Sequence, residues 1–144
     1  MVILFDQFHL PEDIYEIIFA TPQQKIVAKV LIQEMKSNGG EVSKSIMSWV
    51  ATQLHEGKLI TAIDDPAYKG KEIRISYNKR QFYDRILTPM KSMGLIDYDL
   101  YKKTYKISTH FGLELQKIGF LWGQEAKKPA LPVRTRIKKP EEMK

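Results

Sequence analysis

The stretch that decides the fold runs from Ser76 to Trp122 and reads SYNKRQFYDRILTPMKSMGLIDYDLYKKTYKISTHFGLELQKIGFLW. Its first part predicts a basic amphipathic helix over residues 76–92, capped by Ser76 and closed by Gly94. Apolar residues recur at helical spacing along one face of it: Phe82, Ile86 and Met90. Pro89 falls inside this pattern, so we expect it to kink the helix or to end its regular part near Leu87.

Two short segments with alternating hydrophobicity follow that helix. Residues 95–100 and 104–108 each place apolar side chains at every second position, which predicts an antiparallel hairpin with Tyr101-Lys102-Lys103 at its tip. The stretch ends in a second amphipathic helix, expected over residues 110–122, whose apolar stripe is Phe111, Leu115, Ile118 and Trp122.

Upstream of this stretch, cap residues predict three more helices. Acidic residues follow Pro11 in a short helix near residues 11–19, Thr21-Pro22 starts the next helix, and Ser43 caps the third. The expected buried residues of the second and third helices are Ile26, Val27, Val30, Leu31, Met35, Ile46, Trp49, Val50 and Leu54. Residues 57–75 are an insertion, in which Leu59–Ile63 and Glu72–Ile75 have strand character.

Composition sets bounds on the class of protein. The 144 residues, 43% hydrophobic and 28% charged, fit one soluble domain, and the lack of cysteine suits a cytoplasmic protein. No apolar run is long enough for a membrane span, and we expect no signal peptide because the N-terminus has no basic region. The net charge of +6 favours a polyanionic partner. The charge is uneven: residues 1–20 are acidic, whereas residues 69–91 and 123–144 are basic.

The outward side of the helix at 76–92 carries the residue types that read DNA bases. Arginine pairs with guanine through two hydrogen bonds, and asparagine or glutamine pairs with adenine. The candidate base-reading residues are therefore Arg80 and Arg85, with Asn78 and Gln81. The alternative interpretation is a solvated helix face with ordinary salt bridges.

Further basic and tyrosine side chains are candidates for contacts with the DNA backbone, which give salt-dependent affinity more than sequence choice. They are Lys69, Lys71, Arg74, Tyr77, Lys79, Tyr83, Lys102, Lys103 and Lys106. A hairpin with a lysine-rich tip is also a common solubility device, so the hairpin indicates DNA binding only in combination with the adjacent basic helix.

From Thr21 to about Trp122 the chain resembles winged helix-turn-helix transcription regulators of the MarR and PadR-like type. The resemblance lies in TPQQKIVAKVLIQEM, in EVSKSIMSWVATQL and most of all in LTPMKSMGLIDYDLYKKTYKIST. It implies an α+β, mainly α fold with a β-hairpin wing and flanking terminal helices. A flexible basic tail is expected separately, because the chain after Gly123 has prolines, scattered basic residues and no periodicity. The expected parts are an acidic segment (1–20), the winged domain (21–109), a C-terminal helix (110–122) and the tail (123–144).

The resemblance also implies two-fold dimers on palindromic DNA, built from the terminal helices. The dimer interface would use Ile14, Ile18, Phe111, Leu115, Ile118 and Trp122. The alternative for the last helix is that it packs on its own core.

Residues that would support catalysis do not form a recognisable motif. His9, His55 and His110 lack metal-ligand spacing, and the pairs Asp64-Asp65 and Asp97/Asp99 suit a turn and a strand face. We therefore expect no enzyme activity, no metal and no cofactor. The leading hypothesis is a sequence-specific regulator bound to double-stranded DNA. Its alternatives are a protein-binding adaptor in a transcription, replication or partition complex, working through residues 123–144, and an RNA-associated factor.

Overall fold

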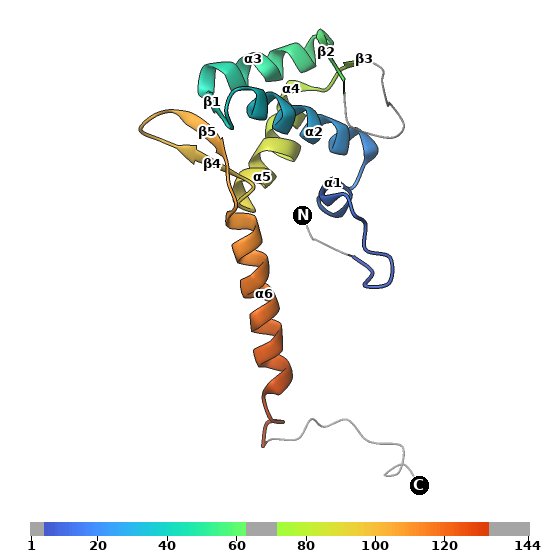
Figure 1. The fold of residues 1–144 in the computed structure, drawn as a ribbon, viewed down its shortest axis with the longest axis vertical. Helices are drawn as coiled ribbons and strands as arrows, with labels where there is room; N and C mark the ends of the chain where they lie inside the picture. Colours follow the sequence, from blue (N-terminus) through green and yellow to red (C-terminus); the bar gives the residue numbers. More distant parts are fainter. Residues whose placement is uncertain (1–4, 63–71, 133–144) are drawn as a thin grey trace. The chain divides into compact units, whose positions relative to one another are not determined.

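The computed structural model describes residues 5–62 and 72–132 (Figure 1). The first three helices each begin with a side-chain cap. In α1 (Ile14–Ile18) the cap is Asp13, whose carboxylate accepts the Tyr15 N–H. The caps predicted for the next two helices are confirmed: Thr21 accepts the Gln24 N–H at the start of α2 (Pro22–Ser37), and Ser43 accepts the Ile46 N–H at the start of α3 (Lys44–His55). Each oxygen satisfies an amide that the helix itself leaves unpaired.

The predicted basic helix is continuous but irregular, and it begins later than expected. It consists of α4 (Lys79–Gln81), a π-helical turn η2 (Phe82–Leu87) and α5 (Thr88–Ser92). The cap is Asn78, which accepts the Gln81 N–H, so the prediction of Ser76 was wrong. Pro89 has no N–H to donate, and the turn before it is widened, with the Thr88 N–H reaching the Tyr83 carbonyl five residues back. The expected disturbance near Leu87 is therefore confirmed.

Two antiparallel sheets complete the fold. β1 (Glu41–Ser43), β5 (Thr104–Ile107) and β4 (Ile96–Asp99) form a three-stranded sheet in that order, with Tyr105 opposite Val42 on one side and Tyr98 on the other. β2 (Leu59–Ala62) and β3 (Glu72–Ile75) pair as a separate hairpin. The hairpin predicted over residues 95–108 is thus confirmed, with β1 as a third strand, and the two segments of strand character in the insertion pair with each other.

The core lies where α2, α3 and the η2–α5 helix meet beside the three-stranded sheet (Figure 1). Its largest fully buried side chains are Val27, Leu31, Met35, Met47, Val50, Leu54, Phe82, Ile86, Leu87, Met90 and Ile96. Two expected members are wrong: Trp49 is 52% exposed and Ile46 also faces solvent. α3 is rotated so that Met47 and Ala51 point inward beside Val50 and Leu54.

The chain divides into two compact units, residues 1–112 and 113–144. The last helix, α6 (His110–Lys127), begins in the first unit and continues in the second. It extends past Gly123, so the expected helix end at residue 122 and tail start at 123 were wrong. Trp122, at the expected end of this helix, is 70% exposed. The tail from residue 133 lies outside the described residues.

The described fold is α+β and mainly helical, as the sequence predicts. Within residues 5–62 and 72–132, no helix combines the length and apolar character that crossing a membrane requires.

Candidate nucleic-acid interface

Three hydrogen bonds fix the start of α4 against the C-terminal half of α3. The Tyr77 N–H donates to the Leu54 carbonyl at 2.9 Å, and the Lys79 N–H donates to His55 Nδ1 at 3.1 Å. The Lys79 ammonium donates to Thr52 Oγ1 at 3.1 Å. These contacts join the two helices directly.

The same contacts change the roles predicted for two residues. Tyr77 was expected to touch the DNA backbone, but it is 5% exposed and belongs to the core, so that prediction was wrong. Lys79 is partly buried and its ammonium is engaged by Thr52. Tyr83 is a weaker candidate than expected, because it packs edge-on against Phe82 with ring centroids 5.6 Å apart.

The candidate base-reading residues do lie on an exposed helix face. Arg80, Gln81 and Arg85 are exposed, and Arg80 Nε lies 3.7 Å from the Asp84 carboxylate one turn along. An exposed pair of this kind contributes little to stability, so the guanidinium can exchange partners readily. Asn78 is exposed as well, but its side-chain oxygen is used as the helix cap.

The π-turn brings the two arginines toward one side of the helix. In a regular α-helix, residues five apart point about 140° away from one another, because one turn takes 3.6 residues. In a π-turn the hydrogen bond spans five residues, so residues five apart are close to one full turn apart. Most of the Arg80–Arg85 interval lies in η2. The widened turn therefore rotates Arg85 about the helix axis toward the side that carries Arg80.

A second basic surface lies between the start of α3 and the tip of the β4–β5 hairpin. A hollow of about 720 Å³ is lined only by hydroxyl and ammonium side chains: Ser43, Lys44, Ser45, Ser48, Lys102 and Lys103. The Lys44 N–H donates to the Lys103 carbonyl at 2.9 Å, which ties the tip of the hairpin to the helix. We call this surface the lysine–serine hollow.

Sequence reasoning found only the two hairpin lysines of this hollow. Lys44, Ser45 and Ser48 were assigned no role, because nothing local shows that the start of α3 faces residues about 60 positions later. The one available signal was the cap at Ser43, since a helix N-terminus attracts anions. The lining has no carboxylate, and its three lysines carry positive charge.

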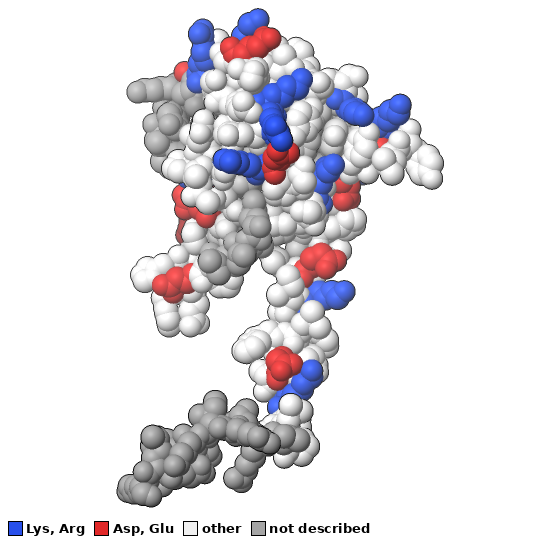
Figure 2. Space-filling view, turned by 180° about the vertical axis from the view of Figure 1, so that it is seen from behind, with Lys and Arg blue, Asp and Glu red and all other residues white. Residues whose placement is uncertain are grey.

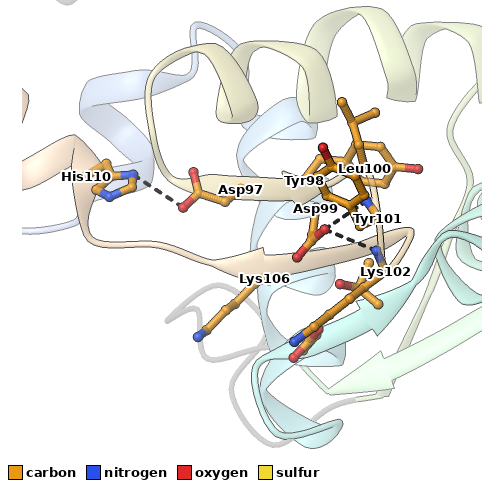
Figure 3. Close-up of a pocket in the computed structure, with 10 residues that line it drawn as sticks. Asp97, Tyr98, Asp99, Leu100, Tyr101, Lys102, Lys106 and His110 are labelled. Atoms are coloured by element: carbon orange, nitrogen blue, oxygen red, sulfur yellow. Dashed lines mark hydrogen bonds and ion pairs between the residues drawn. The ribbon is translucent and has the colours of Figure 1, made fainter.

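The outer face of the same hairpin has mixed charge. Lys106, a predicted backbone contact, is exposed but lies between Glu41 on β1 and Asp97 on β4 as a cross-strand neighbour of both. Asp97 also lies 3.3 Å from His110 Nδ1, as Figure 3 shows. Because opposite charges on neighbouring strands attract, Lys106 is a poorer phosphate ligand than Lys102 or Lys103.

Lys91, near the end of α5, links the helix to the hairpin. Its ammonium lies 5.6 Å from the ring centroid of Tyr98 and 5.9 Å from that of Tyr105, within the range of cation–π attraction. The centroids of the two tyrosine rings lie 4.6 Å apart. Burial raises the pKa of Tyr105, and the neighbouring Tyr83 and Tyr98 raise it further, so its hydroxyl stays neutral. The contact holds helix and hairpin as one surface.

The remaining predicted site residues are scattered. Arg74 is exposed on β3, whereas Lys69 and Lys71 lie outside the described residues. Of the expected dimer residues, Ile18 was wrong, because it is 4% exposed and part of the core. Phe111 is partly buried against that core. The residues left exposed are Ile14, Leu115, Ile118 and Trp122.

In the part of the chain that the structure describes, no group of three or more His, Asp or Glu side chains is arranged to hold a metal ion. Comparison of the chain with protein-family models, with curated proteins and with solved structures found no match.

Proposed function

We propose that this protein binds double-stranded DNA in a sequence-specific manner, as a winged helix-turn-helix regulator. The helix from Lys79 to Ser92 enters the major groove, and the β4–β5 hairpin is the wing. The observation that carries the proposal is the pairing of an exposed arginine face with a carboxylate-free hollow on adjacent elements. A groove-reading helix beside a backbone clamp is the arrangement that separates base recognition from positioning.

The lysine–serine hollow has the chemistry of a phosphate site. Phosphate oxygens accept hydrogen bonds and carry negative charge, and the lining offers three ammonium groups together with serine hydroxyls, all of which can donate. Lys44, Lys102 and Lys103 would each neutralise charge on the DNA backbone and release counterions. The hollow therefore holds the backbone while Arg80 and Arg85 read base edges.

We further propose that two copies bind together through α6. Residues 113–127 of α6 have no buried side chain. Apolar residues nevertheless occur on several sides of this helix: Leu113, Leu115, Ile118, Phe120, Leu121 and Trp122. A helix with so much apolar surface is typically covered by a partner. A second copy is the occupant that also gives two reading helices for two half-sites.

Selection of bound duplexes from random DNA, followed by titration, tests the proposal. We expect one sequence class to bind about 10³-fold or more above bulk DNA. Arg80→Ala and Arg85→Ala should weaken the selected site by roughly tenfold or more each and relax its sequence at defined positions. Gln33→Ala, a change on α2 away from both basic surfaces, is the matched control.

Two outcomes would overturn the proposal. Equal affinity for selected and bulk DNA would remove sequence-specific reading and favour an adaptor that works through protein contacts. Unchanged affinity and sequence preference in both arginine variants would show that the helix from Lys79 to Ser92 does not read bases.

A further inference from the structure

The tip of the β4–β5 hairpin displays two adjacent apolar side chains. Leu100 is 76% exposed and Tyr101 is 99% exposed, whereas Ile96 and Tyr105 lower in the hairpin are buried. In Figure 3 both side chains lie at the far end of the hairpin from His110. Single exposed apolar residues are ordinary. Two neighbouring ones at the outermost point of a hairpin form a defined apolar tip.

The loop that carries this pair is held in place from three directions. The Asp99 carboxylate accepts the N–H groups of Tyr101 at 2.9 Å and of Lys102 at 3.1 Å, as Figure 3 shows. Lys103 adopts the left-handed conformation, with φ 54°, which closes the turn. The Lys103 carbonyl is bonded to the Lys44 N–H. A loop fixed in this way has little backbone entropy left to lose on binding.

Charge beside the tip indicates what it meets. Lys102 and Lys103 follow Tyr101 directly and line the lysine–serine hollow, which has no carboxylate. Figure 2 shows the end of the hairpin as uncharged surface beside basic side chains. An apolar point bordered by cations matches the minor groove of a duplex, where an apolar side chain enters between base pairs while phosphates lie on both sides.

We propose that Leu100 and Tyr101 form a wedge that enters the minor groove and kinks the DNA, an inference that rests on the proposed DNA-binding function. Leu100 enters between two base pairs, and Tyr101 covers the sugar and the edge of the unstacked base. Lys102 and Lys103 hold the flanking phosphates in the hollow. The preferred ligand carries a flexible pyrimidine–purine step, TA or CA/TG, under the hairpin tip, because such steps unstack most easily.

A bending experiment on the full chain tests the wedge. The selected duplex, labelled with a donor and an acceptor dye at its ends, reports the bend by energy transfer, and 2-aminopurine at the proposed step reports unstacking. We expect a bend within about 20–90° and a rise in 2-aminopurine fluorescence on binding. Replacing the TA or CA/TG step by a stiff A-tract should weaken wild-type binding roughly tenfold.

Two variants separate the wedge from the phosphate contacts. Leu100→Ser with Tyr101→Ser should abolish the bend and remove the preference for the flexible step, while the salt dependence stays as in the wild type. Lys102→Ala with Lys103→Ala should lower affinity and salt dependence on every duplex. Both pairs are exposed, so circular dichroism should show unchanged folding. Tyr101→Phe, which keeps the ring, should retain the bend.

The outcomes distinguish the two proposals. If the wild type binds its selected site but leaves it straight, or if the serine variant bends it equally, the wedge is wrong and the DNA-binding function stands. If the wild type binds no duplex above background, both are wrong.

Discussion

Replacing Gly94 by alanine should destabilise the first unit more than the same change at any other described glycine with positive φ, namely Gly39, Gly40 or Gly57. Gly94 has φ +84°, and an added Cβ would lie 2.9 Å from both the His110 Cβ and the Phe111 backbone nitrogen. The Gly94 carbonyl also accepts the Phe111 N–H at 3.0 Å. The substitution therefore combines backbone strain with a collision against backbone that cannot rotate away.

The size of the effect follows from these two contributions. A left-handed conformation costs a residue with a Cβ about 1–2 kcal/mol, and the collision adds about 1–3 kcal/mol as overpacking. Alanine also lowers the conformational entropy of the unfolded chain, and this offsets less than about 1 kcal/mol of the loss of stability. We expect a net loss of about 2–4 kcal/mol in the free energy of unfolding, or about 1–2 M in the urea midpoint.

Gly39→Ala is the matched control, because Gly39 has a similar φ of +78° but no atom within 4 Å of an added Cβ. It should lose only the strain, about 1 kcal/mol after the unfolded-state gain. Urea unfolding followed by circular dichroism measures both variants. Equal losses in the two variants would refute the close approach between Gly94 and the first turn of α6.

Three further predictions concern the charge and apolar surfaces. Lys44→Ala should lower affinity on all duplexes alike and reduce the slope of log affinity against log salt by about 1; a change in sequence preference instead would mean that the hollow reads bases. Trp122→Glu should give a folded protein that sediments as a monomer and binds a palindromic site much more weakly, whereas a wild type that is already monomeric at micromolar concentration would exclude the dimer. Burial alone would raise the pKa of Asp13, but the hydrogen bonds from Lys29 and the Tyr15 N–H, with the charges of Lys29 and Lys25, outweigh burial and lower that pKa. The stability that results is present above the unfolded pKa near 4 and is lost in acid. Asp13→Ala should therefore cost about 1 kcal/mol at pH 7 and progressively less as the pH falls below 4, whereas an equal loss at pH 7 and pH 3 would contradict this.

Local chemistry in the sequence predicted most element boundaries. Thr21 and Ser43 cap the helices they precede, and the alternation around Tyr98 and Tyr105 marks the hairpin, because a cap or a strand period depends on neighbours in sequence. The π-turn was not predicted in form, although Pro89 showed where the helix would be disturbed.

The rotation of each helix about its axis could not be predicted in the same way. Trp49 has helical core spacing, yet α3 packs through Met47 and Ala51 instead. Tyr77 has a basic, polar neighbourhood in sequence, but its N–H reaches the Leu54 carbonyl and its ring enters the core. Ile18 was assigned to the dimer interface, but its side chain is buried in the core. For Tyr77 the deciding contact is with a residue more than 20 positions away in sequence.

The pairing of β1 with β5 has a consequence for the order of folding. Val42 and Tyr105 face each other across about 60 residues of chain, and a loop of that length must close before the pairing contributes any stability. A two-stranded hairpin alone is marginally stable in water, so β4 and β5 gain their rigidity only after α2, α3 and the η2–α5 helix have collapsed. The lysine–serine hollow, whose lining comes from both ends of this loop, therefore cannot form before β1 reaches β5. A partly folded chain, such as one still emerging during synthesis, would lack the surface that we assign to DNA.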